Sequence, residues 1–244
     1  MRTFRLTLEY DGTCLNGFQC QPNCRTVQGE LQRALGHVFQ RKIKAVGSGR
    51  TDSGAHAEGQ TVHIKLNTKI PPDNIKRALN HYLPQDISVV DVQVAPPKFH
   101  AQFSARWKTY QYRVLNADVR SPLARFRAYF VPYPLKVAAM KHAARSFVGR
   151  HDFRAFESSG GRRKNAVRTI RKLTLHKQGS MMTFTVEANG FLYKMVRSLV
   201  GTLLEVGRGR LSIQKVSRGL RLKNRKLMGP TAPAHGLTLL GVTY

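Results

Sequence analysis

The sequence predicts an α+β protein made of two halves of similar composition. Two kinds of hydrophobic spacing support this fold class. Apolar and polar residues alternate in several short segments, as in half-buried strands, and apolar residues recur every three or four positions in others, as in amphipathic helices. Both kinds occur in each half of the 244-residue chain, and 41% of its residues are hydrophobic, which is enough for a buried core.

The first half alternates strands with helices. The three segments with strand-like alternation are residues 4–10, 62–66 and 90–94. The two segments with helical spacing are residues 27–38, behind Thr26 as the expected N-cap, and residues 72–83. The order strand, helix, strand, helix, strand predicts one compact α+β half.

The second half contains the same kinds of element. Strands are expected over residues 167–175, 182–186 and 237–240, and helices over residues 137–149, 189–208 and 213–222. In the helix from Asn189, an apolar face leaves Arg197 on another side. Arg197 is therefore either directed into a groove or part of a solvated basic face.

Residues 157–165 are polar, glycine-bearing and basic, and we expect a mobile loop that closes on a phosphate backbone.

Aromatic and basic residues are interleaved where the two halves join, over residues 99–113. The aromatic members are Phe103, Trp107, Tyr110 and Tyr112. One interpretation is an RNA-binding surface, because bases stack on rings while cations meet phosphates. The other is a buried strand with basic residues at its edges, which we favour for most of these aromatic residues.

The charge of the chain is strongly positive. Lysine and arginine number 41 against 13 acidic residues, which gives a formal net charge of +28. The excess is not confined to a tail, since residues 1–152 contain 23 basic and 10 acidic residues and the remainder 18 and 3. This indicates a polyanionic partner. We favour nucleic acid over a membrane surface, because the sequence has no long uncharged apolar run and no lipidation signal.

The N-terminal region indicates a cytoplasmic protein. The first strand is expected from Phe4, which leaves no room before it for a signal peptide. Cys14, Cys20 and Cys24 are clustered at a spacing that fits no common zinc motif. Free thiols are the favoured interpretation, and a metal site completed by histidines elsewhere is the alternative.

The stretch from Gly47 to Gln60 is rich in glycine and is centred on Asp52. Glycine permits close approach of a ligand to the backbone. Arg50 and His56 place cationic or hydrogen-bonding groups nearby. A guanidinium beside a carboxylate keeps it ionised and oriented, which suits a nucleophile. The alternative is a glycine-rich turn with a local Arg/Asp pair. A phosphate-binding P-loop is excluded, because no Gly-Lys-Ser/Thr follows.

Residues 49–56, Gly-Arg-Thr-Asp-Ser-Gly-Ala-His, together with Gly59-Gln60, resemble the catalytic signature of the TruA-type tRNA pseudouridine synthases. Further motifs of that family occur in the right order along nearly the whole chain. They are Tyr10-Asp11-Gly12, Val27-Gln28, Leu83-Pro84-Gln85-Asp86-Ile87, Phe99-His100-Ala101, Phe103-Ser104-Ala105, Tyr110-Gln111-Tyr112, Met195-Val196-Arg197 and Ala232-Pro233-Ala234-His235-Gly236-Leu237.

The resemblance implies a set of site residues. Asp52 resembles the nucleophile with which these isomerases detach uracil from its ribose and reattach it through carbon 5. Tyr110 resembles the tyrosine that packs against the target base, and Arg197 the arginine that pairs with the catalytic aspartate. Leu237 lies in the segment that resembles the apolar wall of the uracil pocket. Arg50 resembles a residue that helps the target nucleotide leave its stack.

The resemblance also implies the architecture and the partners. The expected fold has two RRM-like (ferredoxin-like) halves, residues 1–104 and 105–244, with mostly antiparallel sheets that meet around a basic active-site cleft. The expected substrate is tRNA, at uridines 38, 39 and 40 of the anticodon stem-loop. No cofactor or metal is expected, and the expected assembly is a homodimer.

The chain departs from the family pattern at a few positions. Phe18 stands where tryptophan is usual, Ala55 where valine is common, and Tyr193-Lys194 where histidines are frequent. The first change keeps an aromatic residue and concerns packing, the second is mild, and the third puts any RNA contact by those histidines in doubt.

Two other functions remain open from the sequence. One is a non-catalytic RNA-binding protein in which Asp52 only orders a loop, and the other is a pseudouridine synthase that acts on other RNA positions. A metal-dependent nuclease is disfavoured, because the acidic residues are scattered along the chain.

Overall fold

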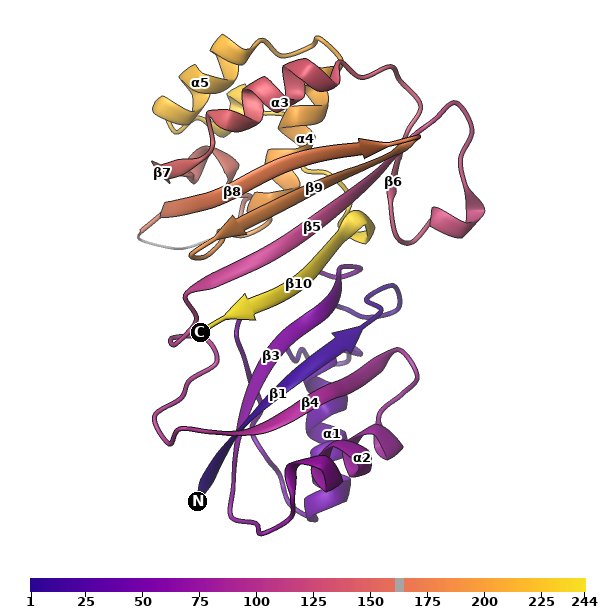
Figure 1. Cartoon of the computed structure of the whole chain (residues 1–244), viewed down its shortest axis with the longest axis vertical. Coiled ribbons are helices and arrows are strands. Elements are labelled where there is room, and N and C mark those ends of the chain that lie inside the picture. The colour runs from indigo at the N-terminus through magenta and orange to yellow at the C-terminus, as the bar shows by residue number, and fades with distance from the viewer. Residues whose placement is uncertain (161–164) are drawn as a thin grey trace. The chain divides into compact units, whose positions relative to one another are not determined.

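The computed structural model describes residues 1–160 and 165–244 (Figure 1). The loop expected over residues 157–165 therefore lies partly outside the described residues. Contacts divide the chain into two units: unit 1 comprises residues 1–106 and 238–244, and unit 2 comprises residues 107–237. The division expected from the sequence, 1–104 and 105–244, differs mainly in assigning the last strand to the second half.

Unit 1 is built on a sheet with β1 (Arg2–Tyr10) at its centre. Strand β1 pairs antiparallel with β3 (His56–Leu66) on one side and with β4 (Ile87–Ala95) on the other. The short strand β2 (Val46–Gly47) runs antiparallel to β3. The last strand, β10 (Leu237–Thr243), pairs in parallel with the beginning of β3, through Thr238 and Leu239. The neighbour order β4-β1-β3-β2 is that of a ferredoxin-like unit.

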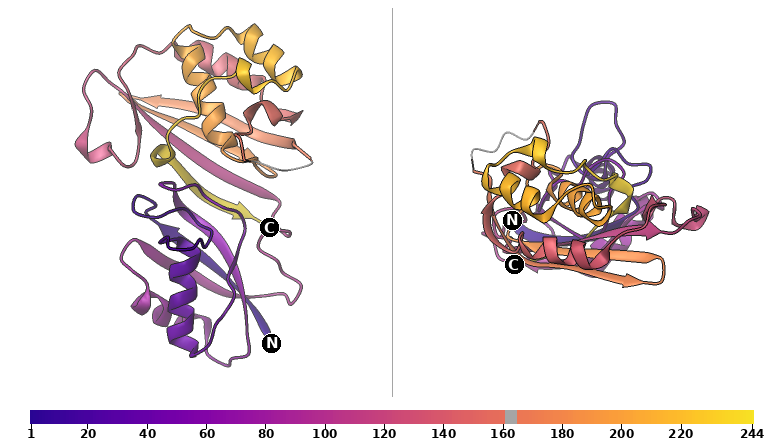
Figure 2. Two further views of the ribbon diagram at one scale, coloured as in Figure 1. Left: turned by 180° about the vertical axis from the view of Figure 1, so that it is seen from behind. Right: turned by 90° about the horizontal axis from the view of Figure 1, so that it is seen from above.

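Two helices cover one face of this sheet, α1 (Val27–Phe39) and α2 (Pro72–Tyr82). In the view from behind, α1 lies in front of the strands of unit 1 (Figure 2). The alternation expected for the first strand is confirmed, since Phe4, Leu6 and Leu8 are fully buried. Burying each such side chain contributes about 1.5–3 kcal/mol to folding. Thr26 caps α1 as expected, because its hydroxyl accepts the Gly29 N–H at 3.2 Å.

Unit 2 is built on an antiparallel sheet of four strands in the order β5-β9-β8-β7. Their bounds are β5 Trp107–Asn116, β7 Gly149–Asp152, β8 Val167–Gln178 and β9 Met181–Ala188. The short strand β6 (Tyr129–Val131) runs parallel to β5.

Three helices lie together on one face of the unit 2 sheet (Figure 1). They are α3 (Val137–Arg145), α4 (Met195–Gly207) and α5 (Ile213–Arg221). Four short 3-10 helices complete the described part of the chain: η1 Pro122–Ala124, η2 Arg154–Phe156, η3 Arg225–Leu227 and η4 Ala234–Gly236. The expected fold class, α+β with mostly antiparallel sheets, is confirmed.

Some expected boundaries were wrong. The helix expected from Asn189 begins at Met195, because Lys194 adopts a left-handed conformation with φ of 57° that no continuous helix contains. The helix expected to end near Gly149 ends at Arg145, and Gly149, with φ of 109°, starts β7 instead. Strands β6 and β7 were not predicted, because three or four residues are too few to display a period.

Candidate active site

Asp52 lies in the loop between β2 and β3. Its backbone carbonyl accepts the Ala55 N–H at 3.1 Å, which closes a tight turn. Gly54, within the turn, has φ of 80°, a conformation that residues with a Cβ atom adopt at a cost. The Asp52 side chain is half-buried, whereas its neighbour Arg50 is exposed. The turn therefore holds the carboxylate at the surface of a well-ordered loop.

The base of the loop is held by Gln60 and Ser48, both of which are fully buried. The Ser48 hydroxyl donates to Gln60 Oε1 at 2.7 Å, and Gln60 Nε2 donates to the Gly49 carbonyl at 3.0 Å. The Ser48 N–H also bonds the Thr61 carbonyl at 2.8 Å. The glutamine of the signature thus fixes the backbone just before Arg50, which gives its place in the motif a physical reason.

The Tyr10-Asp11-Gly12 motif at the end of β1 is hydrogen-bonded to the same loop. The Tyr10 and Thr51 hydroxyls lie 2.8 Å apart, and the Gly12 N–H donates to His56 Nδ1 at 3.1 Å. A Cβ atom on Gly12 would lie 1.9 Å from the Ala55 carbonyl oxygen, so only glycine fits there. Burial raises the pKa of Tyr10 to about 12, so its hydroxyl stays protonated at neutral pH.

Residues 15–18 contact the loop from a second direction. The Phe18 N–H donates to the Thr51 carbonyl at 3.2 Å, and the Gly54 N–H donates to the Leu15 carbonyl at 3.2 Å. The Phe18 ring packs where a Cβ atom on Gly47 would lie, 2.4 Å from its carbons. Phe18 is buried, so the aromatic side chain at this position serves packing, as expected from the sequence.

Asp86, from the Leu83–Ile87 motif, is bonded to both segments that contact the Asp52 loop, through Asp11 and Arg25. Arg25 donates to both carboxylate oxygens of Asp86, at 2.7 and 2.6 Å, and this pairing raises the pKa of Arg25. The Asp11 N–H bonds the Asp86 carbonyl at 2.9 Å, and the Asn16 N–H bonds the Arg25 carbonyl at 2.8 Å. Sequence reasoning identified these motifs but missed that they hold the Asp52 loop, because the contacts join segments far apart in the chain.

In unit 2, Tyr110 lies on β5 opposite Val186 of β9. It is buried and meets the Phe191 ring edge-to-face, with the centroids 5.1 Å apart. Phe191 was not singled out from the sequence. Two positions on, Tyr112 is fully buried, as expected for a core strand, and its hydroxyl donates to the Pro233 carbonyl at 2.7 Å. Burial also raises the pKa of Tyr112.

Arg197 lies in the first turn of α4 and is tied to residues 229–232. Its Nε donates to the Ala232 carbonyl at 2.7 Å, and the Ala232 N–H donates back to the Arg197 carbonyl at 3.1 Å. Arg197 is half-buried and bonded to the backbone of Ala232, so its side chain is not fully solvated. The reciprocal pair fixes the guanidinium on a rigid helix.

The segment before Leu237 packs closely on the rest of unit 2. A Cβ atom on Gly201 of α4 would lie 1.8 Å from the Pro230 carbonyl oxygen, and one on Gly236 would lie 2.7 Å from the Tyr112 ring. The Thr202 hydroxyl accepts the Gly229 N–H at 3.0 Å. Leu237 itself is buried, at the start of β10. Close packing therefore defines the path of the chain up to Leu237.

Each unit positions its own share of the expected site residues. Asp52 and Arg50 belong to unit 1, and Tyr110, Arg197 and Leu237 belong to unit 2.

Among the described residues, no group of His, Cys, Asp and Glu side chains could hold a metal ion. Cys14, Cys20 and Cys24 are free and exposed, as favoured from the sequence. No helix in the described part of the chain is long and apolar enough to cross a membrane.

Comparison with known proteins gives a consistent result. The family model described as tRNA pseudouridine synthase matches residues 7–104 and 143–244. Relatives named tRNA pseudouridine synthase A include one from Geobacillus sp. (strain WCH70), 46% identical over the whole chain and 98% of the relative. Another, from Halalkalibacterium halodurans, is 44% identical over 97% of this chain and 90% of the relative. A third, from Acetivibrio thermocellus, is 41% identical over both full lengths. A solved Cbf5-Nop10-Gar1 complex aligns with 82% of this chain and 54% of that chain at 13% identity, with a TM-score of 0.36, which is too low to support an inference.

Proposed function

Because this chain belongs to the tRNA pseudouridine synthase family, it is an isomerase that acts on uridine in tRNA, and we propose that Asp52 is its nucleophile. The observation that carries this proposal is the construction of the Asp52 loop. Hydrogen bonds from Gln60, Tyr10 and Gly12 to the Gly49 carbonyl, the Thr51 hydroxyl and the His56 ring hold the loop on both sides of one carboxylate. A preorganised nucleophile avoids the reorganisation that a mobile loop would require.

The reaction needs one nucleophile and no redox partner. The bond between N1 of the uracil and C1′ of the ribose breaks, and a new bond forms between C5 and C1′. The hydrogen on C5 leaves as a proton, and N1 gains a proton. The Asp52 oxygen attacks either the ribose or the base, and in both cases it is released at the end. The other site residues bind and orient the nucleotide.

Binding requires that the target uridine leave its stack, at a cost of a few kcal/mol. We propose that Arg50 assists this step, since it is exposed directly beside the fixed turn. Tyr110 and Leu237 supply apolar surface for the uracil, and Arg197 supplies a cation held in one orientation by Ala232. These roles follow the resemblance, residue by residue.

We further propose that the substrate region is the anticodon stem-loop, at uridines 38, 39 and 40. This assignment rests on the family resemblance of the signature. A tRNA transcript with cytidine at all three positions should release no tritium from carbon 5 of uridine, while the unmodified transcript should do so. Full turnover on the substituted transcript would favour the alternative, a pseudouridine synthase that acts on other positions.

We also propose a homodimer in the cytoplasm. Exposed free cysteines fit a reducing compartment. Unit 2 exposes apolar side chains on one segment, with Leu123 96% exposed and Val119 77% exposed, and a second copy would shield such groups from water. Light scattering should give twice the 27.5 kDa of one chain, and a mass of 27.5 kDa would contradict the dimer.

A further inference from the structure

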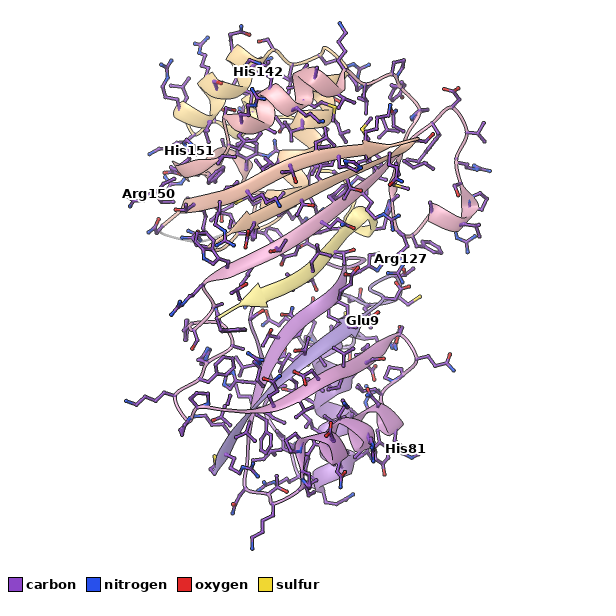
Figure 3. All side chains as sticks on the ribbon, viewed as in Figure 1. Glu9, His81, Arg127, His142, Arg150 and His151 are labelled. Carbon is purple, nitrogen blue, oxygen red and sulfur yellow. The ribbon has the colours of Figure 1, made fainter. Side chains whose placement is uncertain are left out.

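Unit 2 carries a groove of about 490 Å³ that none of the expected site residues lines. Its walls come from the end of α3, from β7 and from the end of α5. Figure 3 labels Arg150 and His151 at this edge of unit 2. Of the described residues that line the groove, Leu220 alone is apolar. Small-molecule pockets are mostly apolar, so a groove with this lining fits a polar or charged ligand.

The charges in the groove favour an anion. Arg150 and Arg221 line it and are exposed, and Ser146 and Ser217 line it as well. Asp152 is the one carboxylate among the described lining residues. Its Oδ2 pairs with Lys223 Nζ at 3.2 Å, while its Oδ1 accepts the Arg154 N–H at 3.0 Å. Because Asp152 is neutralised, the two arginines leave the groove positive.

Lys223 occupies a position that normally belongs to glycine. Its φ is 56°, the left-handed conformation just after α5. The Asn224 N–H bonds the Gly219 carbonyl at 3.0 Å and the Lys223 N–H bonds the Leu220 carbonyl at 3.2 Å, which is the Schellman pattern. Glycine is favoured there because it has no Cβ atom. The backbone at Lys223 is therefore strained, while its side chain pairs with the Asp152 carboxylate in the groove.

The helix dipole does not account for these basic residues. Arginine in the last turn of a helix offsets the partial negative charge of unpaired carbonyls. At the end of α5, however, the Arg218, Gly219 and Leu220 carbonyls already accept backbone N–H groups. Arg150 lies on a strand, where no such dipole acts.

The groove lies at the far edge of the unit 2 sheet from Tyr110. Strands β9 and β8 separate β5 from β7, and three strand spacings amount to about 14 Å. An RNA whose uridine is bound at Tyr110 is far longer than this distance. The groove is thus placed to meet a different part of the same RNA.

We propose that this groove binds backbone phosphates of tRNA outside the nucleotide that reacts. The proposal rests on the proposed function, because it takes tRNA as the ligand. Unit 2 contains 27 of the 41 basic residues and 5 of the 13 acidic ones, so it provides most of the attraction for a polyanion. The guanidinium groups of Arg150 and Arg221 match the geometry of phosphate oxygens.

The test compares the affinities of tRNA and of a single uridine nucleotide for one double variant. Arg150→Gln with Arg221→Gln should weaken binding of full-length tRNA about tenfold near 0.15 M salt, and should lower the slope of log K against log salt by about 1.8. Binding of uridine 5′-monophosphate, which is too short to reach the groove from Tyr110, should not change. The matched control is Arg41→Gln with Arg77→Gln, which removes the same charge from exposed positions of unit 1 and should leave both affinities near wild type.

A second variant separates binding from stability. Lys223→Gly relieves the strained conformation, so its Tm should equal the wild-type value or rise by about 2 °C. It leaves the Asp152 carboxylate unneutralised in the groove, so tRNA affinity should fall several-fold. Gln40→Gly, at the left-handed C-cap of α1, is the control, and should raise Tm without changing affinity.

Unchanged tRNA affinity in the Arg150/Arg221 double variant, or equal loss of affinity for tRNA and uridine 5′-monophosphate, would overturn the proposal. So would a drop in Tm of the Lys223→Gly variant with normal tRNA affinity. Tritium release by the wild-type protein on the same tRNA reports the proposed function separately, since binding and turnover are independent readouts.

Discussion

At the scale of single residues, the site depends on groups whose contacts hold the Asp52 loop. Gln60 bonds Ser48 and Gly49, Tyr10 bonds Thr51, and Gly12 leaves room for Ala55. A signature read from the sequence gives the residue types but not these partners. The structure explains why glutamine follows the aspartate at a fixed spacing: its side-chain amide bonds both the Ser48 hydroxyl and the Gly49 carbonyl, on the strand side of the Asp52 loop.

Tyr10 gives a prediction about pH. Its pKa is raised from 10.0 to about 12 by burial, so the folded protein binds this proton more tightly than the unfolded chain. The resulting stabilisation is complete below pH 10 and is lost as the pH rises through about 12. Tyr10→Phe should reduce the loss of unfolding free energy between pH 10 and 12 by roughly 2–3 kcal/mol.

Urea unfolding at several pH values measures this difference. Tyr10→Phe also loses the hydrogen bond to Thr51, which should cost about 1 kcal/mol at pH 7. Because desolvation also raises the pKa values of the buried Tyr112 and the half-buried Tyr244, part of the loss of unfolding free energy above pH 10 should remain in the variant. An unchanged profile above pH 10 would show that the Tyr10 hydroxyl is not buried in solution.

At the scale of elements, the long helices and strands could be predicted because their periods extend over nine or more residues. The alternation in β1 and the apolar face of α1 are examples. The start of α4 could not be predicted, because the apolar period continues through residues 189–194 while Lys194 turns the backbone left-handed. Strand β7, with the sequence Gly-Arg-His-Asp, has no apolar residue and gains its place from pairing with β8.

The contact between α4 and residues 229–232 gives a second prediction. Gly201→Ala would place a Cβ atom 1.8 Å from the Pro230 carbonyl oxygen, so the loop must move away from the helix. The same loop bonds Arg197 through Ala232. We expect kcat to fall at least tenfold, a loss of about 1.4 kcal/mol of transition-state stabilisation, and the unfolding free energy to fall by about 1–3 kcal/mol.

The control for this prediction is Gly36→Ala. Gly36 also lies inside a helix, but a Cβ atom there would have its nearest neighbour at 3.9 Å. This variant should be stabilised by about 0.5–1 kcal/mol and should keep full activity. Equal kinetics of the two variants, measured with saturating tRNA, would mean that the loop position does not matter for turnover.

At the scale of the whole molecule, the sequence indicated the substrate class more securely than the arrangement of the site. The charge of +28 is visible in the composition, but only the structure assigns most of it to unit 2. Asp52, Arg50, Tyr110, Arg197 and Leu237 were identified by motif position. Phe191 was not identified, and Asp86 and Ala232 were identified only as members of motifs, because the roles of all three depend on contacts between segments that are remote in the chain.

The central claim is that Asp52 carries out the chemistry while many basic residues hold the RNA. The most direct measurement uses unmodified tRNA with tritium at carbon 5 of uridine, incubated with wild-type protein and with Asp52→Ala, without added metal or nucleotide. Wild type should release tritium to water and Asp52→Ala should release none, while both bind tRNA with similar affinity. Release by Asp52→Ala at the wild-type rate, or no release by either protein, would contradict the account.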